Sequence, residues 1–248
     1  MGRRLGQHFL VRESILTKIA AAACGDRVDT VIEIGPGKGA LTKHLVERAS
    51  RVIAIEVDPY LVGYLRQKFR DRDNLEIVEN DVMKMDLGQW GPAVIAGNLP
   101  YYITSPIVDR VFETASGWTR AVFLVQKEVA ERLTAEPGSR DYGYLSVHTQ
   151  LFARPEYLFT VSPAAFKPPP KVDSAVVRLT PRDAEAEWGI DDPGAFVRFV
   201  SAAFQQKRKT LRNNLRGDYP RIEESERARS RAEQLSVAEL IGLYRAVV

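Results

Sequence analysis

Short hydrophobic runs alternate with amphipathic stretches between residue 30 and residue 126. This alternation is typical of repeated strand–helix units, whose parallel strands form one sheet. We therefore predict an α/β fold. The predicted strands lie at residues 30–34, 51–56, 75–78, 93–96 and 121–125.

Proline and short polar residues mark two helix starts in this region. Asp58 precedes Pro59, and Ser105 precedes Pro106. Because aspartate and serine cap helix N-termini and proline suits the first helical position, each pair predicts a helix start. The residues between the fourth strand and Ser105 then form a strand-to-helix loop.

The hydrophobic pattern changes towards the C-terminus. Residues 157–161 and 175–179 predict a closing pair of strands, joined by the proline-rich segment 166–171. After Pro181, helices are predicted at residues 196–204, 210–215 and 237–247, the last with a capping box at Ser236 and Glu239. We predict a larger domain at residues 1–181 and a small helical domain at residues 182–248.

Composition narrows the class of protein. The 248 residues are 45% hydrophobic, enough to bury a core. Cys24 is the only cysteine, so no intrachain disulfide can form, and with only His8, His44 and His148 beside it we expect no metal site. No hydrophobic run approaches the roughly 20 residues that cross a bilayer, so we expect a cytoplasmic protein without a membrane partner.

A glycine-rich loop follows the first predicted strand, with Gly35, Gly37 and a third glycine at position 39. Glycine lets the backbone approach a ligand closely, and the following helix offers its N-terminus to an anion. Glu56 ends the next strand 21 positions after Gly35, the usual interval for a carboxylate that binds a ribose. Asp81, after the third strand, is a candidate adenine contact.

This loop alone is compatible with a nicotinamide or flavin dinucleotide, with a purely structural turn, or with S-adenosylmethionine. No second dinucleotide half follows Asp81. S-adenosylmethionine suits the chain better, with its ribose at Glu56, its adenine near Asp81 and its methionine carboxylate at the helix N-terminus.

The sequence Asn98-Leu99-Pro100-Tyr101 occupies the loop after the fourth strand. The Asn98 oxygen and a main-chain carbonyl near Leu99 or Pro100 can accept both hydrogens of an exocyclic amine, while Pro100 fixes the loop. Tyr101 can stack on a base and stabilise developing positive charge. These residues predict methyl transfer to an adenine N6.

Plainer interpretations of the same residues remain open. Asn98 is also typical of a capping turn residue, and Tyr101 and Tyr102 of ordinary core packing. Phe166, held by prolines, is a candidate second wall for the base, although such an aromatic is often only a loop anchor.

Five cations lie between residues 205 and 216 without an acidic residue: Lys207, Arg208, Lys209, Arg212 and Arg216. They form a candidate phosphate-binding segment, with a solvated helical face as the alternative. A net charge of +3 is compatible with a nucleic-acid partner but does not require one.

Taken together, these motifs resemble the ribosomal RNA adenine N6,N6-dimethyltransferases of the small-subunit type. The resemblance spans nearly the whole chain and is carried by GQHFL, VIEIGPGKGALT, EVDP, GNLPYYITSPI, FKPPPKVDSAVVRL and QKRKTLRNNL. It implies a class I S-adenosylmethionine-dependent methyltransferase, with a Rossmann-like seven-stranded sheet and a small helical C-terminal domain. The implied reaction dimethylates two adjacent adenosines in a hairpin loop near the 3′ end of 16S rRNA.

The resemblance also implies partners and site residues. The substrate would be 16S rRNA within the small (30S) ribosomal subunit or its precursor, and we expect a monomer. Asn98 to Tyr101 would bind the target amine. The implied cofactor contacts are His8, Leu10, Gly35, Glu56, Asp81 and Asn98. The family often has asparagine at positions 8 and 102, which leaves the roles of His8 and Tyr102 open.

Two alternatives share these motifs. Related enzymes dimethylate 23S rRNA and confer macrolide resistance, but Leu99, the triple proline and KRKTLRNNL resemble the small-subunit enzyme more. A non-catalytic RNA-binding assembly factor would have kept the fold and lost the reaction, and the intact Asn98, Tyr101, Glu56 and Asp81 argue against it.

Overall fold

The computed structural model describes residues 8–114 and 117–248. The chain divides into two compact units: unit 1 contains residues up to Ala130 together with Glu156–Thr180, and unit 2 contains Glu131–Pro155 together with Pro181–Val248. The division after Thr180 lies close to the predicted boundary. Residues 131–155 differ from the prediction, because side chains such as Tyr142 and Leu151 belong to the hydrophobic core of the helical unit.

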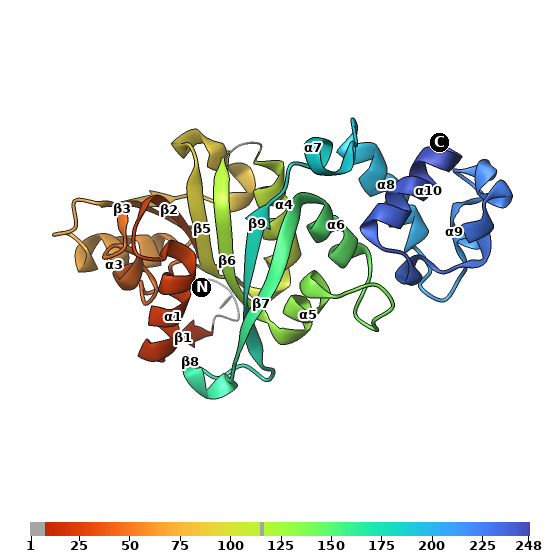
Figure 1. The fold of residues 1–248 in the computed structure, drawn as a ribbon. Helices are drawn as coiled ribbons and strands as arrows, with labels where there is room; N and C mark the ends of the chain where they lie inside the picture. Colours follow the sequence, from red (N-terminus) through yellow and green to blue (C-terminus); the bar gives the residue numbers. More distant parts are fainter. Residues whose placement is uncertain (1–7, 115–116) are drawn as a thin grey trace. The chain divides into compact units, whose positions relative to one another are not determined.

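A seven-stranded sheet forms the centre of unit 1 (Figure 1), with strand order β4-β3-β2-β5-β6-β9-β7. Strands β2 to β6 pair in parallel, and β9 runs antiparallel to β6. The strands are β2 (Val28–Ile34), β3 (Ala49–Glu56), β4 (Leu75–Glu79), β5 (Ala93–Asn98), β6 (Trp118–Gln126), β7 (Ala153–Val161) and β9 (Ser174–Pro181). The α/β fold and every predicted strand are confirmed.

Five helices of the described part of the chain accompany the sheet. They are α1 (Glu13–Cys24), α2 (Thr42–Leu45), α3 (Pro59–Lys68), α4 (Thr104–Glu113) and α5 (Lys127–Thr134). The sequence predicted the starts of two of them, α3 and α4. Asp58 caps α3, accepting the Tyr60 amide at 2.9 Å. Ser105 is not the cap of α4, because the helix already begins at Thr104, whose hydroxyl donates to the Pro100 carbonyl at 3.1 Å.

The N-terminal segment is tied to the proline-rich segment by a small second sheet. Strand β1 (Phe9–Leu10) runs antiparallel to β8 (Phe166–Lys167), with Leu10 opposite Phe166. Helix α1 follows, and its Leu16 and Ile19 are buried in one hydrophobic cluster with Leu10 and Phe166. Gly6 and Gln7 of the N-terminal motif lie outside the described residues.

Unit 2 is helical, as predicted for the C-terminal part. Its complete helices are α6 (Tyr144–Phe152), α7 (Ala184–Trp188), α8 (Pro193–Ala203), α9 (Leu211–Leu215) and α10 (Val237–Val247). Ser236 and Glu239 form the expected capping box of α10. Phe196, Phe199 and Leu240 are fully buried in its core.

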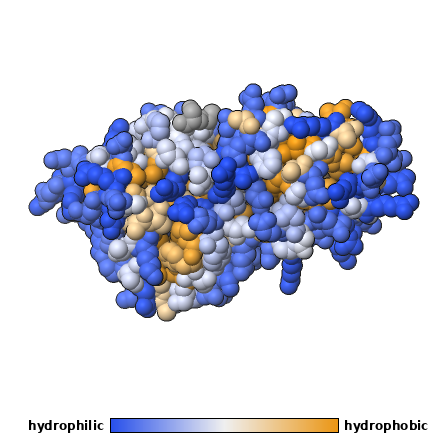
Figure 2. All heavy atoms as spheres, in the orientation of Figure 1, coloured by the Kyte–Doolittle hydropathy of each residue, from blue (hydrophilic) through white to orange (hydrophobic). Residues whose placement is uncertain are grey.

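The molecular face in Figure 2 is mostly hydrophilic, with smaller hydrophobic patches. Among the described residues, no helix combines the length and hydrophobicity needed to cross a bilayer.

Candidate active site

The two predicted loops start from neighbouring strand ends. Strands β2 and β5 pair in parallel, with Glu33 opposite Ala96. Gly97 lies so close to β2 that an added β-carbon would be 2.6 Å from the Ile34 carbonyl oxygen. Only glycine fits here without displacement of a backbone atom. The register therefore brings the glycine loop beside the loop that starts at Asn98.

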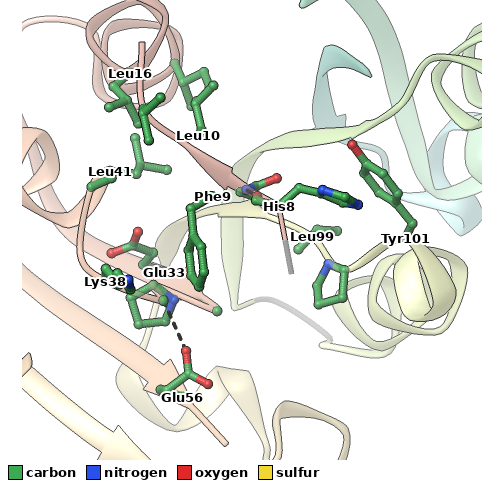
Figure 3. A pocket seen from close by; sticks show the side chains of 18 of the residues that line it. His8, Phe9, Leu10, Leu16, Glu33, Lys38, Leu41, Glu56, Leu99 and Tyr101 are labelled. Carbon is green, nitrogen blue, oxygen red and sulfur yellow. Dashed lines mark hydrogen bonds between the residues drawn. The ribbon is translucent and has the colours of Figure 1, made fainter. Parts of the chain in front are cut away.

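Both loops line one cavity of about 280 Å³ (Figure 3). Its walls come from residues 8–11, 35–38 and 98–102, from Glu56, and from the buried side chain of Glu33. The predicted site residues that meet in this cavity are His8, Leu10, Gly35, Gly37, Glu56, Asn98, Leu99, Pro100 and Tyr101. A cofactor site and an acceptor site can therefore share one space.

Asp81 lies near this cavity but is not one of its lining residues. Strand β4 ends beside β3, where the Asn80 amide donates to the Glu56 carbonyl at 3.1 Å. The Asp81 carboxylate caps a short 3-10 helix, accepting the Met83 amide at 3.0 Å. The structure thus places Asp81 at the expected sheet edge, with a local structural contact.

The structure corrects the expected role of Phe166 as a wall for the base. Phe166 is only 2% exposed and packs in the core behind the lining residues Leu10 and Leu16, and it does not itself line the cavity. Its partner in β1 explains this burial, since the β1–β8 pairing turns both hydrophobic side chains inward. Phe166 is here the loop anchor that the sequence left as the alternative.

The Glu56 carboxylate connects the glycine loop to the end of β3. One oxygen accepts the Gly37 amide at 3.1 Å (dashed in Figure 3), and the other accepts the amides of Val57 and Asp58 at 3.0 and 3.1 Å. Because the two oxygens of a carboxylate offer about four acceptor positions and three amides occupy them here, capacity remains for a ligand hydroxyl.

Glu33 is a second buried carboxyl group in the cavity wall. It is 1% exposed and accepts the Thr42 hydroxyl at 2.6 Å. Burial raises the pKa of Glu33 to about 7, the Thr42 hydrogen bond lowers it, and the nearby Glu56 charge raises it. Two carboxyl groups with little exposure suit a ligand that carries positive charge, such as the sulfonium and ammonium groups of S-adenosylmethionine.

The N-terminal segment spans both halves of the cavity. Phe9 lies over the glycine loop, with the Lys38 ammonium 5.1 Å from its ring centre, and Figure 3 shows it on the Glu56 side. His8 lies on the other side, where its ring stacks on Tyr101 at 5.8 Å and its Nδ1 donates to the Pro168 carbonyl at 2.9 Å. One short segment therefore touches both sub-sites.

The Asn98 side chain has a defined orientation. Its amide nitrogen donates to the His8 carbonyl at 3.1 Å. Because the nitrogen is engaged, the amide oxygen is the free end of the group, and that oxygen is the atom needed to accept a hydrogen from a target amine.

The Tyr101 ring is also fixed. Its hydroxyl lies 2.7 Å from the Ser174 hydroxyl, and Ser174 is completely buried at the start of β9. Burial raises the pKa of Tyr101, so the phenol is neutral at physiological pH. A neutral, anchored ring is suited to stacking.

Sequence reasoning assigned no role to Glu33, Phe9, Lys38 or Ser174. Glu33 carried a signal, since it is a charged residue inside an otherwise hydrophobic strand. Ser174 carried none, because its partner Tyr101 is 73 positions away.

All five predicted RNA-binding cations are exposed on unit 2. Lys207 donates to the Arg140 carbonyl, and Arg212 pairs with Glu223 at 3.0 Å. Arg208, Lys209 and Arg216 have no ion pair within the described part of the chain.

Comparison with known proteins decides the family. The model of the family "Ribosomal RNA adenine dimethylase" matches residues 2–242. The chain belongs to this family. As an rRNA adenine dimethylase, it is an S-adenosylmethionine-dependent methyltransferase, and the residues lining its cavity fit that cofactor.

Similar proteins cover the dimethylase over most of its length. Ribosomal RNA small subunit methyltransferase A of Acidobacterium capsulatum is 48% identical over 217 residues, covering 86% of this chain and 76% of that protein. The protein of the same description from Rubrobacter xylanophilus is 44% identical and covers 99% and 94%.

Two solved structures resemble the dimethylase over nearly its whole length. A dimethyladenosine transferase from Plasmodium falciparum has a TM-score of 0.82 at 26% identity, covering 95% of this chain and 96% of that one. The 23S rRNA methyltransferase ErmE has a TM-score of 0.73 at 31% identity, covering 95% and 98%.

Proposed function

We propose that this dimethylase transfers methyl groups to the N6 atoms of two adjacent adenosines near the 3′ end of 16S rRNA. Its substrate is the small (30S) ribosomal subunit or a precursor, and it acts as a monomer in the cytoplasm. The single cavity shared by Glu56, the glycine loop and Asn98–Tyr101 carries this proposal. The small-subunit descriptions of the relatives at 44% and 48% identity support the choice of RNA.

Hydrogen bonds made by the acceptor loop (Asn98–Tyr101) indicate which of its atoms can hold the target amine. The Pro100 carbonyl already accepts the Thr104 hydroxyl and the Ile103 amide, at 3.1 and 3.2 Å. The Leu99 amide donates to the Leu124 carbonyl at 3.0 Å, which ties the loop to β6. The Asn98 oxygen and the Leu99 carbonyl are then the acceptors for the two N6 hydrogens.

The bound cofactor supplies an electrophilic methyl group on a sulfonium. The chain's part is to hold the amine with two acceptors, which favours the pyramidal nitrogen of the transition state over the planar ground state. Tyr101, anchored at Ser174, stacks on the base and stabilises developing positive charge. The methylated ammonium is acidic enough to lose its proton to water, so no side chain acts as a general base.

Methyl transfer from labelled cofactor to purified subunits tests the proposal. We expect dimethyladenosine in the 16S rRNA of unmethylated small subunits and none in the 23S rRNA of large subunits. Modification of the large subunit alone would identify the macrolide-resistance activity, and RNA binding without any methylation would identify an assembly factor.

The Asn98→Ala variant tests the assigned atoms. It should bind the small subunit with unchanged affinity and lose methylation by a factor on the order of 100, as for other preorganised polar contacts. Unchanged turnover would contradict the role of Asn98.

A further inference from the structure

Two adjacent tyrosines at the cavity lie in different environments. Both belong to the 3-10 helix η3 (Tyr101–Ile103), in which three residues complete a turn, so neighbouring side chains diverge by about 120°. Tyr101 is anchored to the buried Ser174. Tyr102 lines the same cavity but is 63% exposed.

Neither folding nor the proposed reaction explains Tyr102. Within residues 8–114 and 117–248 its ring has no hydrogen bond and no ring partner, and its exposure means that it contributes little to the core. The target amine is held by Asn98 and Leu99, and the target base by Tyr101. An exposed aromatic ring at the rim of a substrate cavity is therefore left without a role.

We propose that Tyr102 is a stacking platform for the nucleotide next to the target adenosine. A base that enters the cavity leaves its chain neighbours at the entrance, unstacked and with one face open to water. Proteins that recognise single-stranded RNA cover such faces with exposed aromatic side chains. The proposal rests on the proposed function, because it requires an RNA base to enter this cavity.

The position of Tyr102 supports a flanking base over the cofactor as its occupant. The glycine loop and Glu56 line the cavity from β2 and β3, whereas Tyr102 lies beyond Tyr101 on the helix after β5. A ring that follows the acceptor loop and is open to solvent can meet RNA that remains outside the cavity.

The test measures coupling between the ring and the neighbouring base. Small subunits are assembled with 16S rRNA that carries an abasic nucleotide on the 5′ or the 3′ side of a target adenosine, and dissociation constants are measured beside unmodified subunits. The variants are Tyr102→Ala, Tyr102→Phe, which keeps the ring, and Tyr60→Ala. Tyr60 is a matched control, because it is 79% exposed on α3 and does not line the cavity.

We expect Tyr102→Ala to weaken binding of unmodified subunits about tenfold, with Tyr102→Phe and Tyr60→Ala close to the wild type. When the abasic nucleotide replaces the base that stacks on Tyr102, the wild type should bind about tenfold more weakly, and Tyr102→Ala should cause no further loss of affinity. An equal Tyr102→Ala penalty on all three subunits, no penalty at all, or a loss of S-adenosylmethionine affinity instead would overturn the proposal.

Wild-type methylation of the unmodified subunits is measured in parallel. If it is absent, the proposed function fails. If it is present and the coupling is absent, only the role of Tyr102 fails.

Discussion

The hydroxyl groups of Tyr101 and Ser174 lie 2.7 Å apart, and this contact joins the acceptor loop to the antiparallel strand β9. Strand β9 pairs with β6, with Gln126 opposite Ser174. The Tyr101 ring is therefore anchored at its far end by a strand in the sheet and at its near end by the loop. Ser174 acts as a positioning residue for the stacking ring.

This contact predicts a double-mutant result. Tyr101→Phe and Ser174→Ala each remove the hydrogen bond and keep the ring, so each should lower kcat by a similar factor, about three- to tenfold. The double variant should be no slower than either single variant. Steady-state kinetics on small subunits measure this, and additive losses would show that the hydroxyls act independently.

The cofactor KM serves as the internal control, because neither hydroxyl contacts the glycine loop. It should stay unchanged in all three variants. Ser174→Thr keeps a hydroxyl at the same position and should recover part of the lost rate.

The close approach of Gly97 to β2 predicts that a glycine-to-alanine substitution destabilises the fold at Gly97 and stabilises it at Gly63. Gly97→Ala places a β-carbon 2.6 Å from the Ile34 carbonyl oxygen, so we expect a loss of about 1–3 kcal/mol in the free energy of unfolding. Gly63→Ala is the matched control in helix α3, where an added β-carbon meets nothing within 4 Å. It should stabilise by roughly 0.5–1 kcal/mol.

Urea unfolding of both glycine variants measures these changes, and cofactor binding adds a second readout. Gly97→Ala should also weaken binding, because the two loops start on either side of the contact. If both substitutions are tolerated equally well, the strands are further apart than described.

Glu33 predicts a pH dependence of stability. Its pKa is about 7 in the folded protein, above its ordinary value of 4.5, because the group is buried. Between these two values the folded state binds more protons than the unfolded state, so stability falls as the pH rises from about 4.5 to 7 and then levels off. The loss attributable to Glu33 is about 3 kcal/mol at most.

The Glu33→Gln variant tests this sign. Glutamine stays neutral and can still accept the Thr42 hydroxyl, so this variant should lack that fall. Urea unfolding at pH 5 and pH 8, without cofactor, should therefore show a larger decrease for the wild type than for Glu33→Gln. Parallel behaviour of the two proteins would mean that Glu33 titrates normally.

Local signals were sufficient for the fold and for the two loops. Hydrophobic alternation predicted the parallel strands, and glycine and proline predicted the loops at their ends. Parallel pairing places the carboxyl ends of these strands at one edge of the sheet, but the strand order that makes β2 and β5 neighbours, and so brings Gly35 and Asn98 together, came from the structure.

Long-range packing was not visible in the sequence. Phe166 is buried because it lies opposite Leu10 in a two-residue strand pair, and no local pattern encodes that pairing. Ser174 and Tyr142 are similar cases, since the partner of each side chain is distant in the chain. The start of α4 lies two residues before the predicted one, with Thr104 in place of Pro106 as the first helical residue and with the Thr104 hydroxyl bonded to the Pro100 carbonyl.

The exposed cations of unit 2 predict a change in salt dependence. Arg208, Lys209 and Arg216 lack ion pairs among the described residues, so their charges are available to RNA phosphates. Replacing all three with glutamine should reduce the slope of log K against log salt by about 2, if each meets a single-stranded phosphate. The measurement is binding to 16S rRNA between low and physiological salt. The control replaces Arg221, Arg227 and Arg229 with glutamine. These residues lie in a segment of mixed charge, and their replacement removes the same net charge. An equal change of slope in both triple variants would assign the effect to overall charge instead of to this segment.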